Sequence, residues 1–310
     1  MGIALLLPIL LVIGVIIGVR QLNNPPVAVG TIDSPSASSA ACAEVVANAP
    51  GRVAGLRRSE IQEPVPAGAA AWSDHITLRC GVQLPLQYTS LSTTENVRGV
   101  EWLLIKDETP GSDLATYYSI NSNAVIAVTT DNGADPREDI SKALSDLSAS
   151  ELSASDLSAE DSSSSDGQGG ETLSYFQLGE KQTPHPLPLS DIAATANSDT
   201  AAYAAALPES MTDAGVEYTK VTVDETTIGY VAAGYESIVI RLGVGMPESY
   251  QAGAQLQQVN NVPWFQETTL ANGITSGTWW ALGQNIGVAA SIPTAAGNAT
   301  LVTLSNSFMR

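Results

Sequence analysis

The residues of this chain that most resemble catalytic groups are Asp74 and His75, at the start of a predicted strand. A histidine oriented by a carboxylate can act as a general base toward a serine, which is hydrolase chemistry. The chain repeats this region, and Ser237 stands at the repeated position of His75. Phosphate-loop, nucleophile-elbow and paired-histidine motifs are also lacking. We therefore expect no catalytic residues and no enzymatic activity.

The chain has two cysteines, Cys42 and Cys80, and two histidines, His75 and His185. The histidines lack metal-ligand spacing, so we expect neither a metal nor a cofactor. A disulfide between the cysteines is the simplest interpretation if the chain leaves the cytoplasm. It would close a loop of about forty residues and stabilise the first domain by roughly 3–4 kcal/mol. Two buried free thiols are the alternative.

Arginine and aromatic residues at repeated positions are the candidates for a binding site. They are Arg79, Trp102, Tyr117, Tyr118, Arg241, Trp264, Trp279 and Trp280. The arginines should lie on the outward side of matched strands, and each aromatic pair should place one ring on each face of its strand. Such a set could hold a sugar, a peptide or another protein. The alternative is a structural role, with core tryptophans and arginines that form salt bridges across the sheet.

The segments that carry these residues occur twice. Ala70 to Pro85 recurs as Ala232 to Pro247, and the match continues without a gap so that Trp102 falls on Trp264. Over about sixty positions we find roughly fifteen identities, and most other apolar positions stay apolar. This internal duplication predicts two homologous domains.

The predicted elements of each copy are antiparallel strands with helices. Ile76, Leu78, Cys80 and Val82 alternate with other residues at the period of a half-buried strand. Further strands are predicted over 100–105, 115–120 and 124–129, with counterparts at 262–267, 278–282 and 286–292. Helices are predicted over 42–49, 136–147 and 298–308. The expected fold class is α+β, with an antiparallel sheet packed against helices in each domain.

The N-terminus predicts a membrane anchor. Ile3 to Val19 contains no charged residue and would span about 26 Å as a helix, close to the ~30 Å hydrocarbon core of a bilayer. A cleaved signal peptide is the alternative, but no small-residue cleavage site follows directly. We expect a retained transmembrane helix over 1–22 and a flexible stalk over 23–41. Flanking charges leave the orientation open, whereas the predicted disulfide and the acidic body favour an extracytoplasmic C-terminal part.

The charge of the chain limits its partners. A formal net charge of −19 argues against nucleic acid and against docking on an anionic leaflet. Residues 149–190 are rich in serine and acidic residues and predict a disordered linker between domains at 42–148 and 191–310. A docking tail for a basic partner is an alternative role for this linker.

Three motifs carry a resemblance to a known family: Ala71-Trp72-Ser73-Asp74, Leu78-Arg79-Cys80-Gly81-Val82 and Gly99-Val100-Glu101-Trp102. With the N-terminal anchor, residues 1–148 resemble the actinobacterial family called domain of unknown function 3515. The resemblance implies a single-pass envelope protein with a cystine linking Cys42 to Cys80, and it implies no activity. Residues 190–310 form a diverged second copy without cysteines.

We expect a non-enzymatic, extracytoplasmic protein of the cell membrane that serves as an accessory or scaffold subunit of a membrane or cell-wall complex. Two tethered domains suit bivalent capture of a protein partner, because linkage raises the effective concentration. One alternative is a glycan- or lipid-binding module with exposed rings near Trp264, Trp279 and Trp280. Another is a cell-wall hydrolase or transferase, with a cleft lined by Asp74, His75 and serines of perturbed ionisation.

Overall fold

The computed structural model describes residues 26–30, 32–109, 111–159, 175–267, 275–294 and 298–308, with side chains from 151 to 159 left out. The predicted anchor over 1–22 and the middle of the predicted linker lie outside these ranges. No helix within them is both long and apolar enough to cross a membrane. The chain forms two compact units. The described residues up to Gln83, with 96–102 and 116–181, form the first, and 84–95, 103–115 and those from Gln182 onward form the second.

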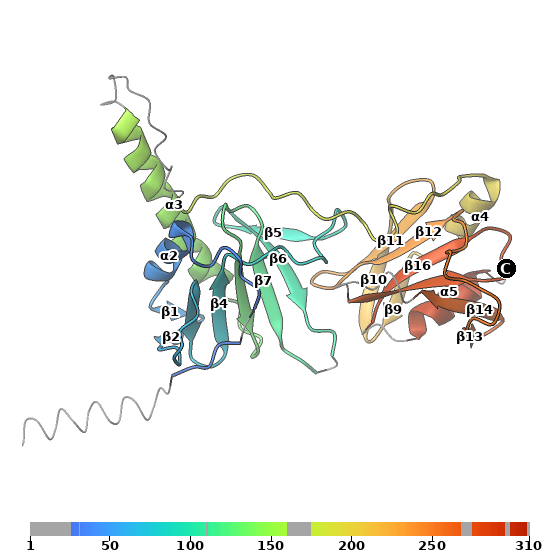
Figure 1. Cartoon of the computed structure of the whole chain (residues 1–310), viewed down its shortest axis with the longest axis horizontal. Coiled ribbons are helices and arrows are strands. Elements are labelled where there is room, and N and C mark those ends of the chain that lie inside the picture. The colour runs from blue at the N-terminus through green and yellow to red at the C-terminus, as the bar shows by residue number, and fades with distance from the viewer. Residues whose placement is uncertain are drawn as a thin grey trace, which may run out of the picture. The chain divides into compact units, whose positions relative to one another are not determined.

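Each sequence copy forms an eight-stranded antiparallel sheet (Figure 1). The first sheet contains β1 (Arg52–Val53), β2 (Leu56–Ser59), β3 (Ala69–Trp72), β4 (Ile76–Cys80), β5 (Thr94–Val97), β6 (Val100–Lys106), β7 (Ala115–Ser119) and β8 (Ile126–Thr130). The second contains β9 (Ser210–Asp213), β10 (Val216–Thr222), β11 (Thr227–Val231), β12 (Ile238–Leu242), β13 (Leu256–Val259), β14 (Val262–Glu267), β15 (Ser276–Ala281) and β16 (Val288–Pro293). The strand orders, β1-β2-β3-β4-β8-β7-β6-β5 and β9-β10-β11-β12-β16-β15-β14-β13, are the same topology. The predicted duplication is confirmed.

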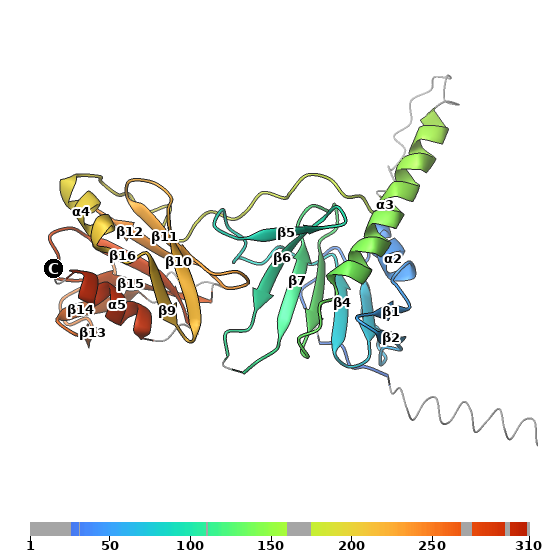
Figure 2. The same cartoon turned by 180° about the vertical axis from the view of Figure 1, so that it is seen from behind.

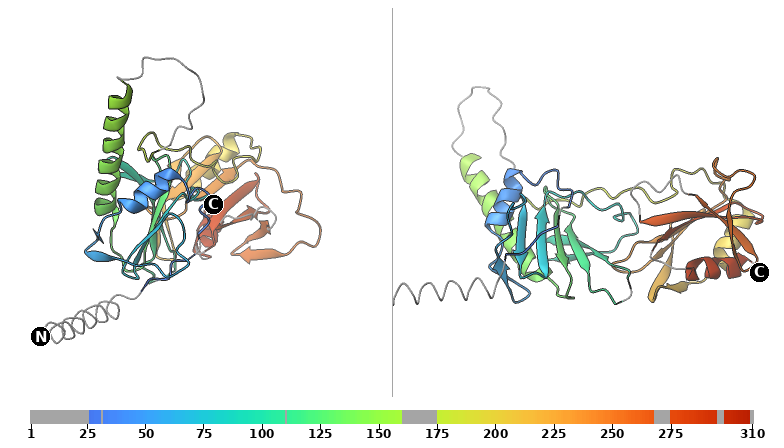
Figure 3. Two further views of the ribbon diagram at one scale, coloured as in Figure 1. Left: turned by 60° about the vertical axis from the view of Figure 1, so that its left-hand side comes forward. Right: turned by 60° about the horizontal axis from the view of Figure 1, so that its bottom comes forward.

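The described helices are α2 (Ala40–Ala47), α3 (Arg137–Ala159), α4 (Ser198–Ala206) and α5 (Ala299–Phe308). Polar side chains start the first helix of each copy: Ser39 caps α2, and Asn197 and Thr200 form a capping box at α4. Figure 2 shows α2 and α3 side by side at β4. The right-hand view in Figure 3 shows α5 against the second sheet.

Helix α3 continues past its predicted end at Leu147 and reaches Ala159, within the predicted linker. The physical reason is that no proline or glycine interrupts 137–159, so nothing in the sequence ends the helix. The chain beyond the linker returns to the first unit. Phe176 is fully buried, and its N–H donates to the Glu44 carboxylate at 3.1 Å. The prediction of a disordered linker is therefore wrong at its two described ends, residues 149–159 and 175–190.

The described part of the predicted stalk is also bound to the sheet. The Val27 N–H donates to the Glu60 carbonyl at 2.8 Å, and the Ser36 N–H donates to the Gly81 carbonyl at 3.2 Å. Gly81 has a φ of +78°, and a Cβ there would collide with the backbone of Ser36. Gly243 repeats this arrangement in the second copy, where a Cβ would collide with Thr195. Glycine thus permits the preceding chain to cross both sheets closely.

The central tryptophans of the two copies have matching surroundings. Trp102 and Trp264 are both buried. The Trp102 indole N–H donates to Ser141 Oγ of α3 at 2.8 Å, and the Trp264 indole N–H donates to Ser305 Oγ of α5 at 2.9 Å. A buried indole needs such a partner because its N–H has lost water. Both copies therefore attach the closing helix to the same strand with the same bond.

A second repeated contact holds the first helix of each copy. Arg58 on β2 donates to the carbonyls of Val46 and Ala49 at 2.8 and 3.1 Å, at the end of α2. Lys220 on β10 donates to two carbonyls at the end of α4, at 2.9 and 3.0 Å. A cation suits this position because the last carbonyls of a helix lack intrahelical donors.

The gapless sequence alignment is wrong at β3. It places Trp72 opposite Gly234, but the sheet places Trp72 opposite Tyr230, because these two residues pair with Arg58 and Lys220, respectively. Their side chains also make the same bond. Trp72 donates to the carbonyl of the proline that follows α2 at 2.7 Å, and Tyr230 donates to the equivalent proline carbonyl after α4 at 2.6 Å. Loops of different length explain the shift.

Both faces of the second sheet are buried. The larger cluster, which α4 and α5 contact, includes Tyr218, Tyr230, Ile240, Trp264, Leu301 and Leu304. The smaller cluster contains Leu189, Val244, Phe265, Trp280 and Ala289. Trp264 and Phe265 are neighbours in β14 and point to opposite faces. The aromatic residues of this copy therefore lie largely in its core.

Candidate functional site

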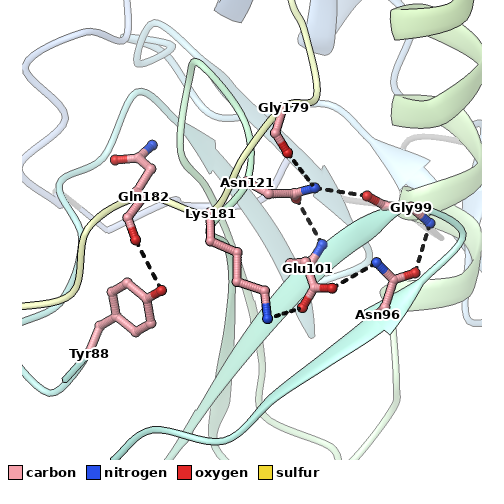
Figure 4. Close-up of polar contacts among 8 residues, drawn as sticks. All are labelled: Tyr88, Asn96, Gly99, Glu101, Asn121, Gly179, Lys181 and Gln182. Carbon is pink, nitrogen blue, oxygen red and sulfur yellow. Dashed lines mark hydrogen bonds and ion pairs between the residues drawn. The ribbon is translucent and has the colours of Figure 1, made fainter. Parts of the chain in front are cut away.

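A polar cluster in the first unit lies where the chain returns from the linker, and we call it the Glu101 network (Figure 4). It comprises Asn96, Gly99, Glu101, Asn121, Gly179 and Lys181. The Glu101 carboxylate accepts a hydrogen bond from the Asn96 amide at 2.9 Å and pairs with Lys181 Nζ at 3.0 Å. Strand β6 thus presents a carboxylate to a cation from the returning chain, and an amide from the neighbouring strand β5 holds that carboxylate in place.

Asn121 forms the other half of the Glu101 network. Its side-chain oxygen accepts the backbone N–H of Glu101 at 2.8 Å, and its amide donates to the Gly99 carbonyl at 2.9 Å and the Gly179 carbonyl at 3.4 Å. The Gly179 N–H donates back to the Asn121 carbonyl at 2.7 Å. Asn121 therefore joins three chain segments. Figure 4 also shows Tyr88, in the second unit, donating to the Gln182 carbonyl at 3.1 Å.

The Glu101 network holds the returning segment against the first sheet. Opposite charges at 3.0 Å and amide hydrogen bonds to backbone groups fix the geometry of this segment. The second copy has Gln258, Pro263 and Gly283 at the positions of Asn96, Glu101 and Asn121. The sequence analysis missed this cluster because its cation lies eighty positions beyond its carboxylate, across the linker. The sequence did contain one signal for this cluster: the second copy lacks its asparagines and its glutamate.

Most aromatic candidates are in the core. Trp102, Tyr117, Trp264 and Trp280 are buried. Tyr118 and Trp279 are half-buried, and burial raises the pKa of the Tyr118 hydroxyl. The structure therefore separates each pair into one buried and one partly accessible ring, and it gives the buried rings structural roles.

The two candidate arginines differ. Arg79 is only 4% exposed, and its Nε and one terminal nitrogen have no hydrogen-bond partner among the described residues. Burial lowers the pKa of its guanidinium. Arg241 donates to the Ile192 carbonyl at 3.0 Å and to Thr227 Oγ1 at 2.7 Å. The expectation of an outward-facing pair is wrong for Arg79, because the chain around Ser36 crosses its face of the sheet.

The hydrolase alternative depends on His75, which lies on an accessible turn with 43% of its side chain exposed. Its Nδ1 lies 2.8 Å from Asp131 Oδ1, and this hydrogen bond raises the pKa of His75. A hydrogen bond from Ser73 lowers the pKa of Asp74. The imidazole thus lies between two carboxylates, because its Nε2 is also 3.4 Å from Asp74 Oδ1, and Asp131 was not predicted as its partner. A carboxylate at Nδ1 is also the arrangement that orients a general-base histidine, but the other ring nitrogen of His75 faces Asp74 and not a serine.

A strongly perturbed carboxyl group, Glu108, lies in the second unit. Desolvation, followed by the charges of Glu236 and Asp213, raises the pKa of Glu108 to about 7. The Glu236 carboxylate itself accepts hydrogen bonds from the hydroxyls of Thr275 and Ser276. Perturbed carboxyls often mark functional sites, but closely packed acids produce the same effect in structural clusters.

The cysteines form the predicted disulfide. Cys42 on α2 and Cys80 on β4 have an S–S distance of 2.01 Å and a Cα–Cα distance of 5.4 Å. Both are fully buried, so the bond joins the first helix to the centre of the first sheet. Within the described parts of the chain, no group of three or more His, Cys, Asp or Glu side chains is placed to hold a metal ion.

Comparison with known proteins identifies the family and no more specific relative. No curated protein and no solved structure matches the chain. One family model, described as "Protein of unknown function (DUF3515)", matches twice, over residues 5–152 and 173–310. Both copies, including the segment that returns from the linker, are covered by this model. The chain therefore belongs to the DUF3515 family and carries two copies of its domain.

Proposed function

We propose that this chain is a non-enzymatic accessory or scaffold protein of an actinobacterial cell envelope, anchored in the membrane by its N-terminal segment. In this proposal the two domains lie outside the cytoplasm and bind protein partners of a membrane or cell-wall complex. The anchor is the apolar run Ile3 to Val19, which lies outside the described residues.

The observation that carries the scaffold proposal is the contrast between the cores and the surfaces of the two copies. The bonds from Trp102 to Ser141 and from Trp264 to Ser305 repeat, but the Glu101 network occurs in one copy only. A duplicated enzyme would be expected to keep its reactive groups in at least one copy. A duplicated binding scaffold needs only its fold, and its surfaces can diverge toward different partners.

The disulfide between Cys42 and Cys80 supports an oxidising compartment. Protease treatment of intact spheroplasts tests this location. We expect both domains of the full chain to be degraded while a cytoplasmic control protein survives. Protection of both domains until the membrane is permeabilised would contradict the proposed orientation.

Crosslinking in intact cells tests the scaffold role. A photo-crosslinking residue would be placed at exposed positions of either unit, for example at Val65 and Val302. We expect a defined set of membrane or cell-wall proteins, identified by mass spectrometry and absent without irradiation. Crosslinks only within the chain, from every position on both units, would contradict the proposal.

One observation favours glycan binding as a second candidate. Trp279 lines a cavity of about 260 Å³ with Gln266 and Gly277. A half-buried indole beside an amide can stack on a sugar ring while the amide bonds its hydroxyls. Soluble cell-wall fragments should then bind the full chain, and Trp279→Ala should weaken binding. Phe265→Leu, which changes the opposite face of the sheet, is the control, and equal binding by all three proteins would exclude this candidate.

A further inference from the structure

The outer edge of β2 in the first copy is completed by the N-terminal part of the described chain. The Arg58 N–H points outward and donates to the Gly51 carbonyl at 3.0 Å. Two residues on, the Glu60 carbonyl accepts the Val27 N–H at 2.8 Å, and the Gln62 N–H donates to the Val27 carbonyl at 2.9 Å. An extended segment therefore pairs with the edge just beyond the helix-binding arginine.

The same edge is open in the second copy. The Lys220 N–H points outward and donates to the Glu209 carbonyl at 2.9 Å, just as the N–H of its counterpart Arg58 donates to the Gly51 carbonyl. Strand alternation makes the N–H and C=O of Thr222 point outward as well, beyond the end of β9. Thr222 is exposed, and no strand of the described chain pairs with it on that side. The chain that precedes α4 bonds elsewhere, because the His185 N–H donates to the Tyr88 carbonyl at 2.8 Å.

This open edge borders a groove, which we call the β10 groove, with a volume of about 590 Å³. Its apolar wall is formed by Ala201, Ala204, Ala205 and Ile228. Its rim carries Asp224 and Glu225. Lys220 also lines the groove, but its ammonium group donates to the end of α4 and pairs with Glu209 at 3.3 Å. The groove thus combines small apolar side chains, unpaired backbone groups and an acidic rim.

We propose that the β10 groove binds an extended segment of a partner protein, which adds to the edge of β10 at Thr222. The partner segment carries a small or β-branched apolar residue at the position that Val27 occupies in the first copy, with basic residues beside it. The Thr222 carbonyl, at the position of the Glu60 carbonyl, and the Thr222 N–H supply the strand pairing, since the Asp224 N–H, at the position of Gln62, already donates to the Thr227 carbonyl at 3.3 Å. The alanines of α4 leave room for the apolar side chain. Asp224 and Glu225 favour the basic flanks. This inference rests on the proposed scaffold function and assigns a binding surface to it.

Peptide binding to the full chain in detergent tests this proposal. The probes are two labelled peptides with the core Pro-Pro-Val-Ala-Val of the N-terminal segment, one flanked by lysines and the other by glutamates. We expect the lysine-flanked peptide to bind at least about tenfold more tightly, as measured by fluorescence anisotropy. Thr222→Pro, which removes the outward N–H at an edge that tolerates proline, and Ala201→Phe, which fills the groove, should each weaken binding at least about tenfold.

Two matched controls keep the backbone edge and the groove intact. Thr222→Val retains the outward N–H, and Ala202→Phe adds the same ring at an exposed neighbour that does not line the groove. Both should bind within about twofold of the original chain, and unchanged urea midpoints confirm folding. No binding by either peptide, or equal binding by Ala201→Phe and Ala202→Phe, would overturn the proposal. If crosslinked partners persist in cells with Thr222→Pro, the scaffold function stands and only this docking edge fails.

Discussion

The two copies secure the same helix in different ways. In the first copy, the disulfide between Cys42 and Cys80 joins α2 to β4. In the second, Thr200 and Leu242 occupy the corresponding positions, and both are buried. Thr200 completes a capping box with Asn197, and its methyl group lies close to the site where a Cβ on Gly243 would project. Ser39 also caps α2 in the first copy, so the first copy adds a covalent bond where the second has a fuller cap and apolar contacts, with no change of topology.

This difference teaches that the disulfide stabilises this fold but does not define it. The fold is defined by contacts that both copies keep: the tryptophan bonds to the closing helix, the cation at the end of the first helix and the glycine where the chain crosses the sheet. The parts that differ lie at the surface and in the connections. Matched substitutions in the two copies should therefore have different effects where the contacts differ and similar effects where the contacts are shared.

Removing the disulfide should have the largest effect. The double substitution Cys42→Ala and Cys80→Ala releases a loop with a sequence separation of 38, which should lower the stability of the first unit by roughly 3–4 kcal/mol. Thr200→Ala should cost the second unit only about 1 kcal/mol, through its helix cap. Urea unfolding followed by hydrogen exchange of each unit measures both. An equal loss in the two units would show that they do not unfold independently.

Neutralising the two arginines should have opposite results. Arg79→Met removes a buried charge whose Nε lacks a partner in the described structure, so the first unit should keep its stability or gain about 1 kcal/mol. Arg241→Met leaves the Ile192 carbonyl without its donor and should cost the second unit about 1–3 kcal/mol. Thermal unfolding of both variants tests this. A large loss from Arg79→Met would reveal a partner of the guanidinium outside the described residues.

Removing the serine hydroxyls that accept hydrogen bonds from Trp102 and Trp264 should lower the stability of both copies by similar, smaller amounts. Ser141→Ala and Ser305→Ala each leave a buried indole N–H without its acceptor, at a cost of about 1–2 kcal/mol. Ser145→Ala on α3, whose hydroxyl is exposed and bonds the Arg98 carbonyl, is the control and should cost less. Different losses from Ser141→Ala and Ser305→Ala would break the equivalence of the two cores.

The smallest effect concerns pH and the first copy alone. The hydrogen bond to Asp131 raises the pKa of His75 above its ordinary value of 6.5. Its contribution to stability is therefore complete below that value and is lost as the pH rises through the pKa of the folded state. Asp131→Asn should return the pKa of His75 toward 6.5, as followed by the imidazole NMR signals. Asp74→Asn should shift it less, and a pKa that is unchanged in Asp131→Asn would exclude this pairing.

The pattern of the sequence was sufficient to predict the strands of both sheets that bear the repeated residues. Val100 to Ile105 and Val262 to Glu267 were predicted because strand periodicity is a local property. Half of the strands were not predicted, namely β1, β2, β3 and β5 with β9, β10, β11 and β13, and segments as short as Arg52–Val53 carry little periodic signal. The candidate rings were correctly assigned to strands, but their burial was not determined by the pattern. Burial depends on which segment covers each face.

The sequence by itself determined the duplication and the family, because repetition and motif identity can be read without coordinates, and it left one possible cysteine pair, with free thiols as the alternative. Only the tertiary structure decided that the chain around Val27 completes one sheet edge, that Lys181 returns to Glu101 and that no described strand pairs with the matching edge at Thr222. The physical reason is that these outcomes are pairings between segments far apart in the chain. Backbone hydrogen bonds form equally well with any extended segment, so residue types alone do not specify the partner.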